Sequence, residues 1–165
     1  MRWDHRAEAA RWTGAALAAV TRHDAQLAAR VPKDIASWCP GYATASLPDR
    51  RAFWVGMMSA VAKYESTWNP AASGAKGKYI GLMQISPQTA RREGCAAQSA
   101  KALKDGAANL ACAVEVFSDN VARDGMVAGN GRQGMGGDWA PFRKSSKRAE
   151  MAAWVRVQPY CKAKG

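Results

Sequence analysis

The sequence predicts a mainly α-helical protein with one small, irregular β-hairpin region. Apolar residues recur at helical spacing in several segments, and residues that commonly cap helices precede some of these segments. A stretch of glycines and small polar residues near the middle interrupts the helical pattern. The 165 residues, 48% of them hydrophobic and 22% charged, suffice for a single domain with its own core.

The N-terminal part of the chain predicts one long helix followed by a loop. Residues 5 to about 30 are rich in alanine, and Leu17, Val20, Leu27 and Val31 recur at helical intervals. The next stretch, VPKDIASWCPGYATASLP, contains three prolines and one glycine, which disfavour regular structure. We therefore expect a long first helix and then an irregular segment.

The middle of the chain predicts two helices separated by the hairpin region. Asp49 is expected to cap a helix that runs to Trp68 and stops before the Asn69-Pro70 pair. Residues 71–85 contain glycines and small polar residues that cannot hold a helix, and they fit a small irregular hairpin. Ser86 followed by Pro87 is a favourable start for the next helix.

The C-terminal part predicts two further helices around a long loop. Asp105 is expected to open a helix that carries Leu110, Val114 and Phe117. The stretch RDGMVAGNGRQGMGGD contains six glycines and predicts a long loop, a feature that often serves function. A final helix is expected over residues 145–157.

The charge of the chain favours polyanionic partners. There are 24 Lys and Arg residues against 13 Asp and Glu, a net charge of +11 that fits nucleic acid, an anionic membrane or the acidic peptide stems of a bacterial cell wall. No zinc-finger or RNA-binding signature is present, so nucleic acid is not expected. No apolar run reaches roughly 18 residues, so stable membrane insertion is not expected either. The one basic cluster, FRKSSKR, fits a solvated helix face or a binding patch.

The cysteines indicate disulfides. Cys39, Cys95, Cys112 and Cys161 are widely spaced and form no CxxC pair of the kind found in zinc or redox motifs. We favour Cys95 with Cys112, which closes a helix-loop-helix segment, and Cys39 with Cys161, which ties the C-terminal tail to an early loop. Four buried free thiols are the alternative. Disulfides indicate an oxidising compartment. Because MRWDHRAEAARW is not a signal peptide, we expect a periplasmic or secreted protein whose signal has been removed.

One carboxylate, Glu65, continues an apolar stripe of the second predicted helix. Trp54, Met58 and Val61 lie at spacings of four and three residues, and Glu65 comes four residues further on. Burial among apolar neighbours raises a carboxyl pKa toward neutrality, which suits a general acid. The alternative is an ion pair at the helix end with Lys63, Lys76 or Lys78.

The residues after Glu65 carry a family resemblance. ESTWNP at 65–70, GLMQ at 81–84 and ISPQTA at 85–90 follow one another in an order and spacing that resemble the lytic transglycosylase domain of the soluble lytic transglycosylase type. DGAANLACAVEVF at 105–117 is similar to the third motif of that family, an Asn-Leu pair on a helix behind the site, here Asn109-Leu110. The resemblance covers roughly the middle third of the chain.

The resemblance implies a lysozyme-like α+β fold, mainly helical and similar to goose-type lysozyme, with the hairpin region beside an active-site groove. Residues 1–165 would then form a single domain, with an N-terminal helix and loop (1–48), a catalytic core (49–123), and a glycine-rich loop and C-terminal helix (124–165). The implied substrate is the glycan strand of peptidoglycan. The implied reaction cleaves the β-1,4 bond between N-acetylmuramic acid and N-acetylglucosamine, with no metal or cofactor.

The resemblance also implies roles for individual residues. Glu65 would first protonate the leaving oxygen and then act as base on the C6 hydroxyl of the muramic acid, which closes a 1,6-anhydro ring. Ser66 would support Glu65. The groove wall beside the reacting sugar would consist of Gly81, Leu82, Met83 and Gln84. Gly81 permits close approach of the backbone to a ligand, and Gln84 offers a donor and an acceptor to an acetamido sugar. Met83 would supply adaptable apolar contact, or be an ordinary core residue.

Three further residues are counted with the substrate-binding set. Tyr79 stands where smaller residues are usual in the family and is expected to narrow the groove. Asn109 belongs to the third motif. The last motif of the family, a Tyr-Asn pair, has only GDWAPF as a counterpart, in which Trp139 takes the place of the tyrosine. Trp139 is either a platform on which a sugar stacks or a core tryptophan.

The distribution of acids favours a transglycosylase over a hydrolase. Most glycosidases use two carboxylates, and this chain has no Asp or Glu between Glu65 and Glu93. A goose-type-like lysozyme remains the alternative, because later acids can fold back: Asp105, Asp119, Asp124 and Asp138. A non-catalytic cell-wall-binding module with the same fold is a third possibility, and a partner in cell-envelope assembly is left open.

Overall fold

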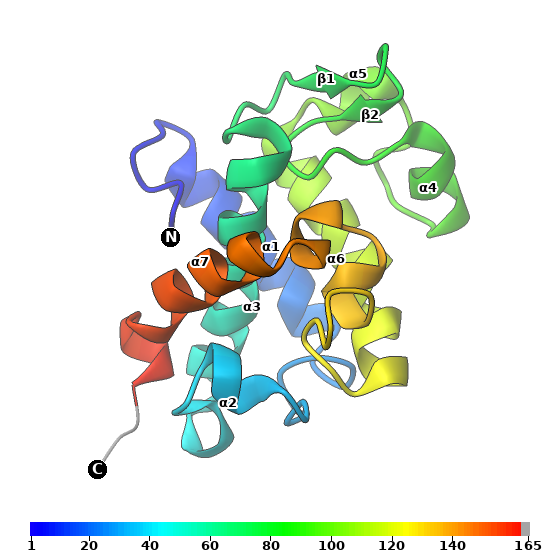
Figure 1. Cartoon of the computed structure of the whole chain (residues 1–165). Helices are drawn as coiled ribbons and strands as arrows, with labels where there is room; N and C mark the ends of the chain where they lie inside the picture. The colour runs from blue at the N-terminus through cyan, green and yellow to red at the C-terminus, as the bar shows by residue number, and fades with distance from the viewer. Residues whose placement is uncertain (163–165) are drawn as a thin grey trace.

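The computed structural model describes residues 1–162, in which helices dominate and a single two-stranded sheet lies at one end (Figure 1). The α-helices of this part are α1 (Ala9–Arg22), α2 (Ile35–Trp38), α3 (Leu47–Ser66), α4 (Pro87–Arg92), α5 (Ala100–Leu103), α6 (Gly106–Asp124) and α7 (Ser145–Arg156). Short 3-10 turns are η1 (Tyr42–Thr44), η2 (Gly134–Gly137), η3 (Ala140–Arg143) and η4 (Pro159–Cys161). The antiparallel strands β1 (Ser73–Gly74) and β2 (Tyr79–Ile80) pair Ser73 with Ile80 and Gly74 with Tyr79. The predicted fold class is confirmed.

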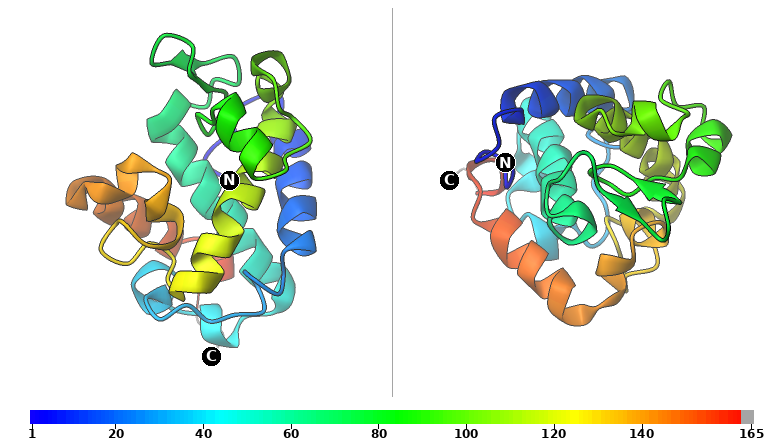
Figure 2. Two further views of the ribbon diagram at one scale, coloured as in Figure 1. Left: turned by 90° about the vertical axis from the view of Figure 1, so that its right-hand side faces the viewer. Right: turned by 90° about the horizontal axis from the view of Figure 1, so that it is seen from above.

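Helix α3 forms the centre of the molecule. Every residue from 53 to 62 is buried, so the helix is covered on all sides and shows no solvated face along that stretch. Helices α1 and α7 pack against it and lie on opposite sides of it when the molecule is seen from above (Figure 2). Because its middle is fixed in this way, the C-terminal turn of α3 has a defined position beneath the hairpin.

Helix α6 forms the second long support. Asp105 accepts a hydrogen bond from the backbone N–H of Ala108 and caps the helix, as predicted. Helix α6 packs against α1, α4, α5 and η2 (Figure 2). Ser86 likewise caps α4, and α7 matches the predicted final helix closely. None of the described helices combines the length and the apolar character needed to cross a membrane.

The predicted N-terminal helix over residues 5–30 is wrong outside Ala9–Arg22, the bounds of α1. Residues 24–29 form successive turns, because side chains from elsewhere bind their backbone carbonyls. The Tyr42 hydroxyl donates to the carbonyl of Leu27, and the Arg50 guanidinium donates to that of Ala28. These bonds replace part of the helical pattern. The helical spacing therefore misplaced Val31, whose surface is 51% exposed.

The loop predicted over residues 31–48 contains more order than expected. It holds α2 and η1, because Ile35 and Trp38 bury their side chains in the core. Ser46, rather than Asp49, caps α3: its Oγ accepts from the backbone N–H of Asp49. The serine also donates to the Asp49 carboxylate, so both residues take part in the cap.

The glycine-rich stretch folds back onto this loop. The Asp34 carboxylate accepts three backbone N–H bonds, from Val127, Ala128 and Gly129. Part of the predicted loop then forms η2. At Gly134 φ is +50°, and an added Cβ would lie 2.3 Å from the carbonyl oxygen of Met126, so only glycine fits. This packing brings residues 138–143 toward the end of α3.

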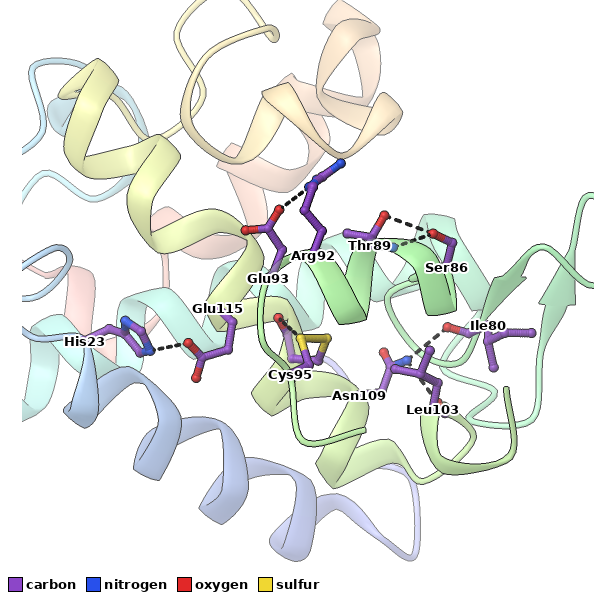
Figure 3. The surroundings of a disulfide bond; sticks show 11 residues. His23, Ile80, Ser86, Thr89, Arg92, Glu93, Cys95, Leu103, Asn109 and Glu115 are labelled. Carbon is purple, nitrogen blue, oxygen red and sulfur yellow. Dashed lines mark hydrogen bonds and ion pairs between the residues drawn. A yellow bond between two sulfur atoms is a disulfide. The ribbon is translucent and has the colours of Figure 1, made fainter. Parts of the chain in front are cut away.

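Both predicted disulfides are present. Cys39 and Cys161 join the loop before α3 to the C-terminal turn η4, and Cys95 and Cys112 join the segment after α4 to α6. Figure 3 shows the second disulfide beside α6, between the His23–Glu115 pair and the residues that border the hairpin.

The two disulfides are expected to differ in their contribution to stability. The Cys39–Cys161 bond spans 122 residues and the Cys95–Cys112 bond spans 17. If restriction of the unfolded chain dominates, replacing the first pair by serines should lower the free energy of unfolding by about 5 kcal/mol, and the second by about 3 kcal/mol. Urea unfolding of both double variants measures the difference. The reverse order would show that native contacts around Cys95–Cys112 matter more than loop length.

Candidate active site

Glu65 lies in the last turn of α3, in a groove of about 440 Å³. The groove is bounded by the hairpin on one side and by the segment after η2 on the other. Its lining consists of Glu65, Gly74, Ala75, Tyr79, Gln84, Asp138, Trp139, Ala140 and Arg143. Among residues 1–162, Glu65 has no hydrogen-bond or ion-pair partner, so its carboxyl group is available to a ligand.

Burial dominates the electrostatics of this carboxyl group. It raises the pKa of Glu65 from 4.5 to about 7, and the positive charge of Lys147 offsets part of the rise. The ion pairs considered from the sequence do not form within the described part of the chain. Lys63 instead lies 3.0 Å from Glu150, Lys78 lies over the ring of Tyr79, and Lys76 is exposed. The helix-end ion pair is therefore wrong as an explanation of Glu65.

The backbone after Glu65 turns sharply away from the helix. Thr67 and Trp68 both adopt positive φ, at 50° and 55°, a conformation that side-chain-bearing residues rarely take. The Trp68 indole N–H donates to the carbonyl of Ser59 and holds this turn against α3. The helix thus ends one residue after Glu65, which leaves the glutamate at the edge of the groove.

Asn109 fixes the segment 81–84, of which Gln84 lines the groove, and we call this segment the wall (Figure 3). Its side chain is fully buried on α6. Its Oδ1 accepts from the backbone N–H of Met83 at 2.8 Å, and its Nδ2 donates to the carbonyls of Ile80 and Leu103 at 2.9 and 3.0 Å. An amide supplies both kinds of bond, which no apolar residue can. Asn109 therefore holds the wall from behind and does not itself line the groove.

The close packing of the wall on Asn109 explains why residue 81 is a glycine. At this residue φ is +80°, and an added Cβ would lie 2.3 Å from both the Asn109 Nδ2 and the Leu103 carbonyl oxygen. The sequence interpretation assigned its lack of a side chain to close approach of a ligand. The structure gives a different reason, since the close approach is to Asn109 on α6 and to Leu103 at the end of α5.

Leu82 and Met83 are fully buried, so their side chains belong to the core. Their carbonyl groups tie the wall to its neighbours. The Ser66 hydroxyl donates to the Leu82 carbonyl at 2.9 Å, and the Trp139 indole N–H donates to the Met83 carbonyl at 2.8 Å. Ser66 thus joins the end of α3 to the wall, one residue from Glu65, without bonding to the carboxyl group.

Tyr79, Gln84 and Trp139 border the groove directly. Tyr79 is 39% exposed, whereas Trp139 is 4% exposed and packs against Phe117, as a core tryptophan does. The Gln84 amide nitrogen donates to the carbonyls of Ala72 and Gly81, so this side chain holds the hairpin as well as lining the groove. A smaller hollow of about 70 Å³ continues from these residues toward Ser86, Thr89 and Val116.

Five lining residues were missed as site residues from the sequence, and two of them, Asp138 and Arg143, are charged. Asp138 lies next to Trp139, and burial raises the pKa of its carboxyl group despite a hydrogen bond from Asn120. It was named only as one of several acids able to fold back. Arg143 belongs to the FRKSSKR cluster, which the sequence left open between a solvated face and a binding patch. Only the packing of η2 and η3 reveals that both residues border the groove.

Loss of the Asn109 amide is expected to loosen the wall. Asn109→Ala leaves the Met83 N–H and the Leu103 carbonyl without their partner inside the protein, which should lower the free energy of unfolding by about 2–4 kcal/mol. Urea unfolding measures the loss. Asn130→Ala is the matched control, since Asn130 is exposed and bonds only locally. Equal effects of the two changes would contradict the role assigned to Asn109.

Loss of the Lys147 charge is expected to raise the pKa of Glu65 further. In Lys147→Met the favourable interaction with the ionised carboxylate disappears while burial stays, so the pKa should move above about 7. An NMR titration of the Glu65 side-chain carboxyl measures it. Lys144→Met removes the same charge from an exposed neighbour and should leave that pKa unchanged. An unaltered titration in Lys147→Met would show that this lysine does not act on Glu65.

Comparison with known proteins places this site in a family. Residues 46–134, more than half of the chain, match the family described as the transglycosylase SLT domain. The structure is similar to Bd0314 DslA in wild-type form 2, with a TM-score of 0.85 and 25% identity over 96% of this chain and 95% of that one. It is also similar to a glutamate-to-glutamine mutant of Bd0314 DslA, with a TM-score of 0.86 and 26% identity over the same shares of the two chains.

No curated protein sequence matches the chain. The family match spans α3 with Glu65, the hairpin, the wall at 81–84 and Asn109 on α6. The chain therefore belongs to the transglycosylase SLT domain family.

Proposed function

We propose that this protein is a peptidoglycan lytic transglycosylase that cleaves the β-1,4 bond between N-acetylmuramic acid and N-acetylglucosamine. One observation carries the proposal: Glu65 is a partly buried carboxyl group with a pKa of about 7 and no hydrogen-bond partner among residues 1–162, at the edge of a groove in an SLT domain. A group with such a pKa exchanges a proton readily in either direction near neutral pH.

The proposed reaction uses Glu65 twice. The protonated carboxyl donates its proton to the glycosidic oxygen as the bond from C1 to that oxygen breaks. The resulting carboxylate then takes the proton of the C6 hydroxyl of the same muramic acid, and that oxygen bonds to C1. The product carries a 1,6-anhydro ring, no water is consumed, and Glu65 returns to its protonated state. Because burial keeps both protonation states accessible near pH 7, one residue suffices for both steps.

The remaining site residues fall into two proposed roles. Tyr79 and Gln84 line the groove and would contact the sugars, and the buried Trp139 borders the groove from the core side. Ser66 and Asn109 hold the wall in place through hydrogen bonds to the backbone of Leu82 and Met83, and Gly81 lets the wall pack closely on Asn109. We therefore assign substrate contact to the first set and support of the wall to the second.

A hydrolase of the same bond is the second candidate, because Asp138 lines the same groove as Glu65. Lysozyme-type hydrolysis commonly employs a second carboxylate as nucleophile or as the base that activates water. The Asp138 carboxylate accepts a hydrogen bond from Asn120 and is exposed, so the products of digestion decide between the two reactions. A non-catalytic wall-binding module is the third candidate, and it would not require a carboxyl group with a raised pKa in the groove.

The cell envelope is the proposed place of action. The two disulfides are compatible with an oxidising compartment such as the periplasm or the exterior of the cell. The net charge of +11 suits attraction to an anionic wall polymer. We propose peptidoglycan as the partner and assign no metal or cofactor to the reaction.

Digestion of purified sacculi, followed by mass spectrometry of the products, tests the proposal. The wild-type protein should release muropeptides with 1,6-anhydro ends, and Glu65→Gln should lower their release by at least about a thousandfold, because the amide cannot donate the proton. Asp138→Asn should retain anhydro products. Reducing ends in place of anhydro ends, abolished by Asp138→Asn, would establish the hydrolase instead.

The glutamine variant also separates catalysis from binding. Glu65→Gln should still sediment with insoluble sacculi, since the groove keeps its shape. Undiminished cleavage by this variant would refute the assignment of Glu65. Binding by the wild-type protein without any cleavage would support the wall-binding module.

A further inference from the structure

A basic segment borders the groove on the side opposite the hairpin. The residues FRKSSKR, 142–148, span the end of η3 and the first turn of α7. Arg143 lines the groove that contains Glu65. Four residues later, Lys147 lies 4.6 Å from the centre of the Tyr64 ring, and Tyr64 directly precedes Glu65. We call Arg143 and Lys147 the cationic rim.

The guanidinium of Arg143 is positioned but not neutralised. Its Nη2 donates to the carbonyl of Gly137 at 3.0 Å, which directs the side chain along η2. Among the described residues it forms no ion pair with a carboxylate. The side chain is exposed, so its other N–H groups can bind an incoming anion, and the planar fork of a guanidinium suits a carboxylate.

The nearest acids do not cancel this charge. Glu150, on the same helix as Lys147, is held by Arg2, Tyr64 and Lys63, and the hydrogen bond from Arg2 is the main reason that its pKa falls to about 2. Asp138 accepts from Asn120, and burial raises its pKa. Lys147 contacts the Tyr64 ring and acts on Glu65 through its charge, but it forms no direct ion pair in the part of the chain that the structure describes. The rim therefore presents positive charge to the groove.

We propose that the cationic rim is a binding subsite for the carboxylates of the peptide stems carried by the glycan strand, and that Arg143 is its principal contact. The proposal rests on the proposed function, because a peptidoglycan strand must occupy the groove. Each muramic acid of the strand carries a peptide stem, so one stem emerges beside the glycosidic bond whose oxygen Glu65 would protonate. Their free carboxylates are the anions that the Arg143 fork is suited to bind.

Glycan strands with free or amidated stem carboxyl groups provide the test. Carbodiimide amidation removes the charge while it keeps the length of the stems. We expect the wild-type protein to have a lower KM for free strands than for amidated strands. Arg143→Gln should raise KM for free strands about fivefold without changing kcat. The same variant should leave KM for amidated strands unchanged. Arg143→Lys should restore part of the preference, since it keeps the charge but loses the fork.

Lys33→Gln is the matched control, because Lys33 is exposed and lies outside the groove. It removes the same charge from the protein and should not alter either KM. An equal KM of the wild-type protein for both preparations would overturn the subsite. The subsite would also be overturned if Arg143→Gln raised KM for free strands and KM for amidated strands by the same factor.

Binding to the Glu65→Gln variant keeps this test separate from the proposed reaction. If the wild-type protein cleaves neither preparation, the reaction is refuted. The affinities of Glu65→Gln for free and amidated strands, with and without Arg143→Gln, then still decide whether the rim recognises stem carboxylates. A preference for free strands that disappears with Arg143→Gln supports the subsite, and the absence of any preference overturns it.

Discussion

The buried amide of Asn109 is the interaction on which the groove depends. It joins three separate backbone groups, at Ile80, Met83 and Leu103, to helix α6. Without these bonds the wall at 81–84 would have no fixed position relative to Glu65, which is carried by a different helix. The absent side chain of Gly81 and the hydroxyl of Ser66 serve the same junction, because they let α6 and α3 approach the wall from two sides. Precise placement of an active group requires this kind of support from outside the site.

The position of Glu65 carries a cost in stability. Burial shifts its pKa from 4.5 to about 7 in the folded protein. The contribution of Glu65 to the free energy of unfolding is therefore largest below pH 4.5, where its carboxyl group is protonated in both the folded and the unfolded protein. This contribution is lost as pH rises through about 7. The loss is on the order of 3 kcal/mol, at about 1.4 kcal/mol per pH unit. The rest of α3 offsets this cost, since residues 53–62 are buried and anchor the helix in the core.

Charge is distributed unevenly around the groove. Several cations of the protein are paired, for example Arg51 with Asp24 and Lys63 with Glu150. Along the rim, however, Arg143 and Lys147 form no direct ion pair with a carboxylate in the described chain, and Lys147 acts on Glu65 through its charge alone. Paired charges contribute little beyond local structure, whereas unpaired charges beside a groove attract a ligand of opposite sign. The excess of basic residues thus has a specific place in the proposed function as well as a general effect on association.

The sequence by itself determined the helical class, the helix caps at Ser86 and Asp105, both disulfide pairings and the apolar stripe that leads to Glu65. The class, the caps and the stripe depend on local patterns, in which the residues concerned are near one another or share a periodicity. The disulfide pairings were favoured among alternatives, and Cys39 and Cys161 are 122 residues apart in the chain. The end of α1 at Arg22 and the order within residues 31–48 depended on distant side chains such as Tyr42, Arg50 and Asp34.

The same limit explains what could not be predicted about the site. A motif shows that Asn109 and Gly81 belong together, but only tertiary packing shows that they contact each other behind the wall. Asp138 and Arg143 reach the groove because the glycine-rich segment folds against Asp34, and its glycines permit turns that no local pattern specifies. The sequence thus determined the acid and its wall. The tertiary structure decided what surrounds them, since contacts between distant segments set burial, charge and the shape of the groove.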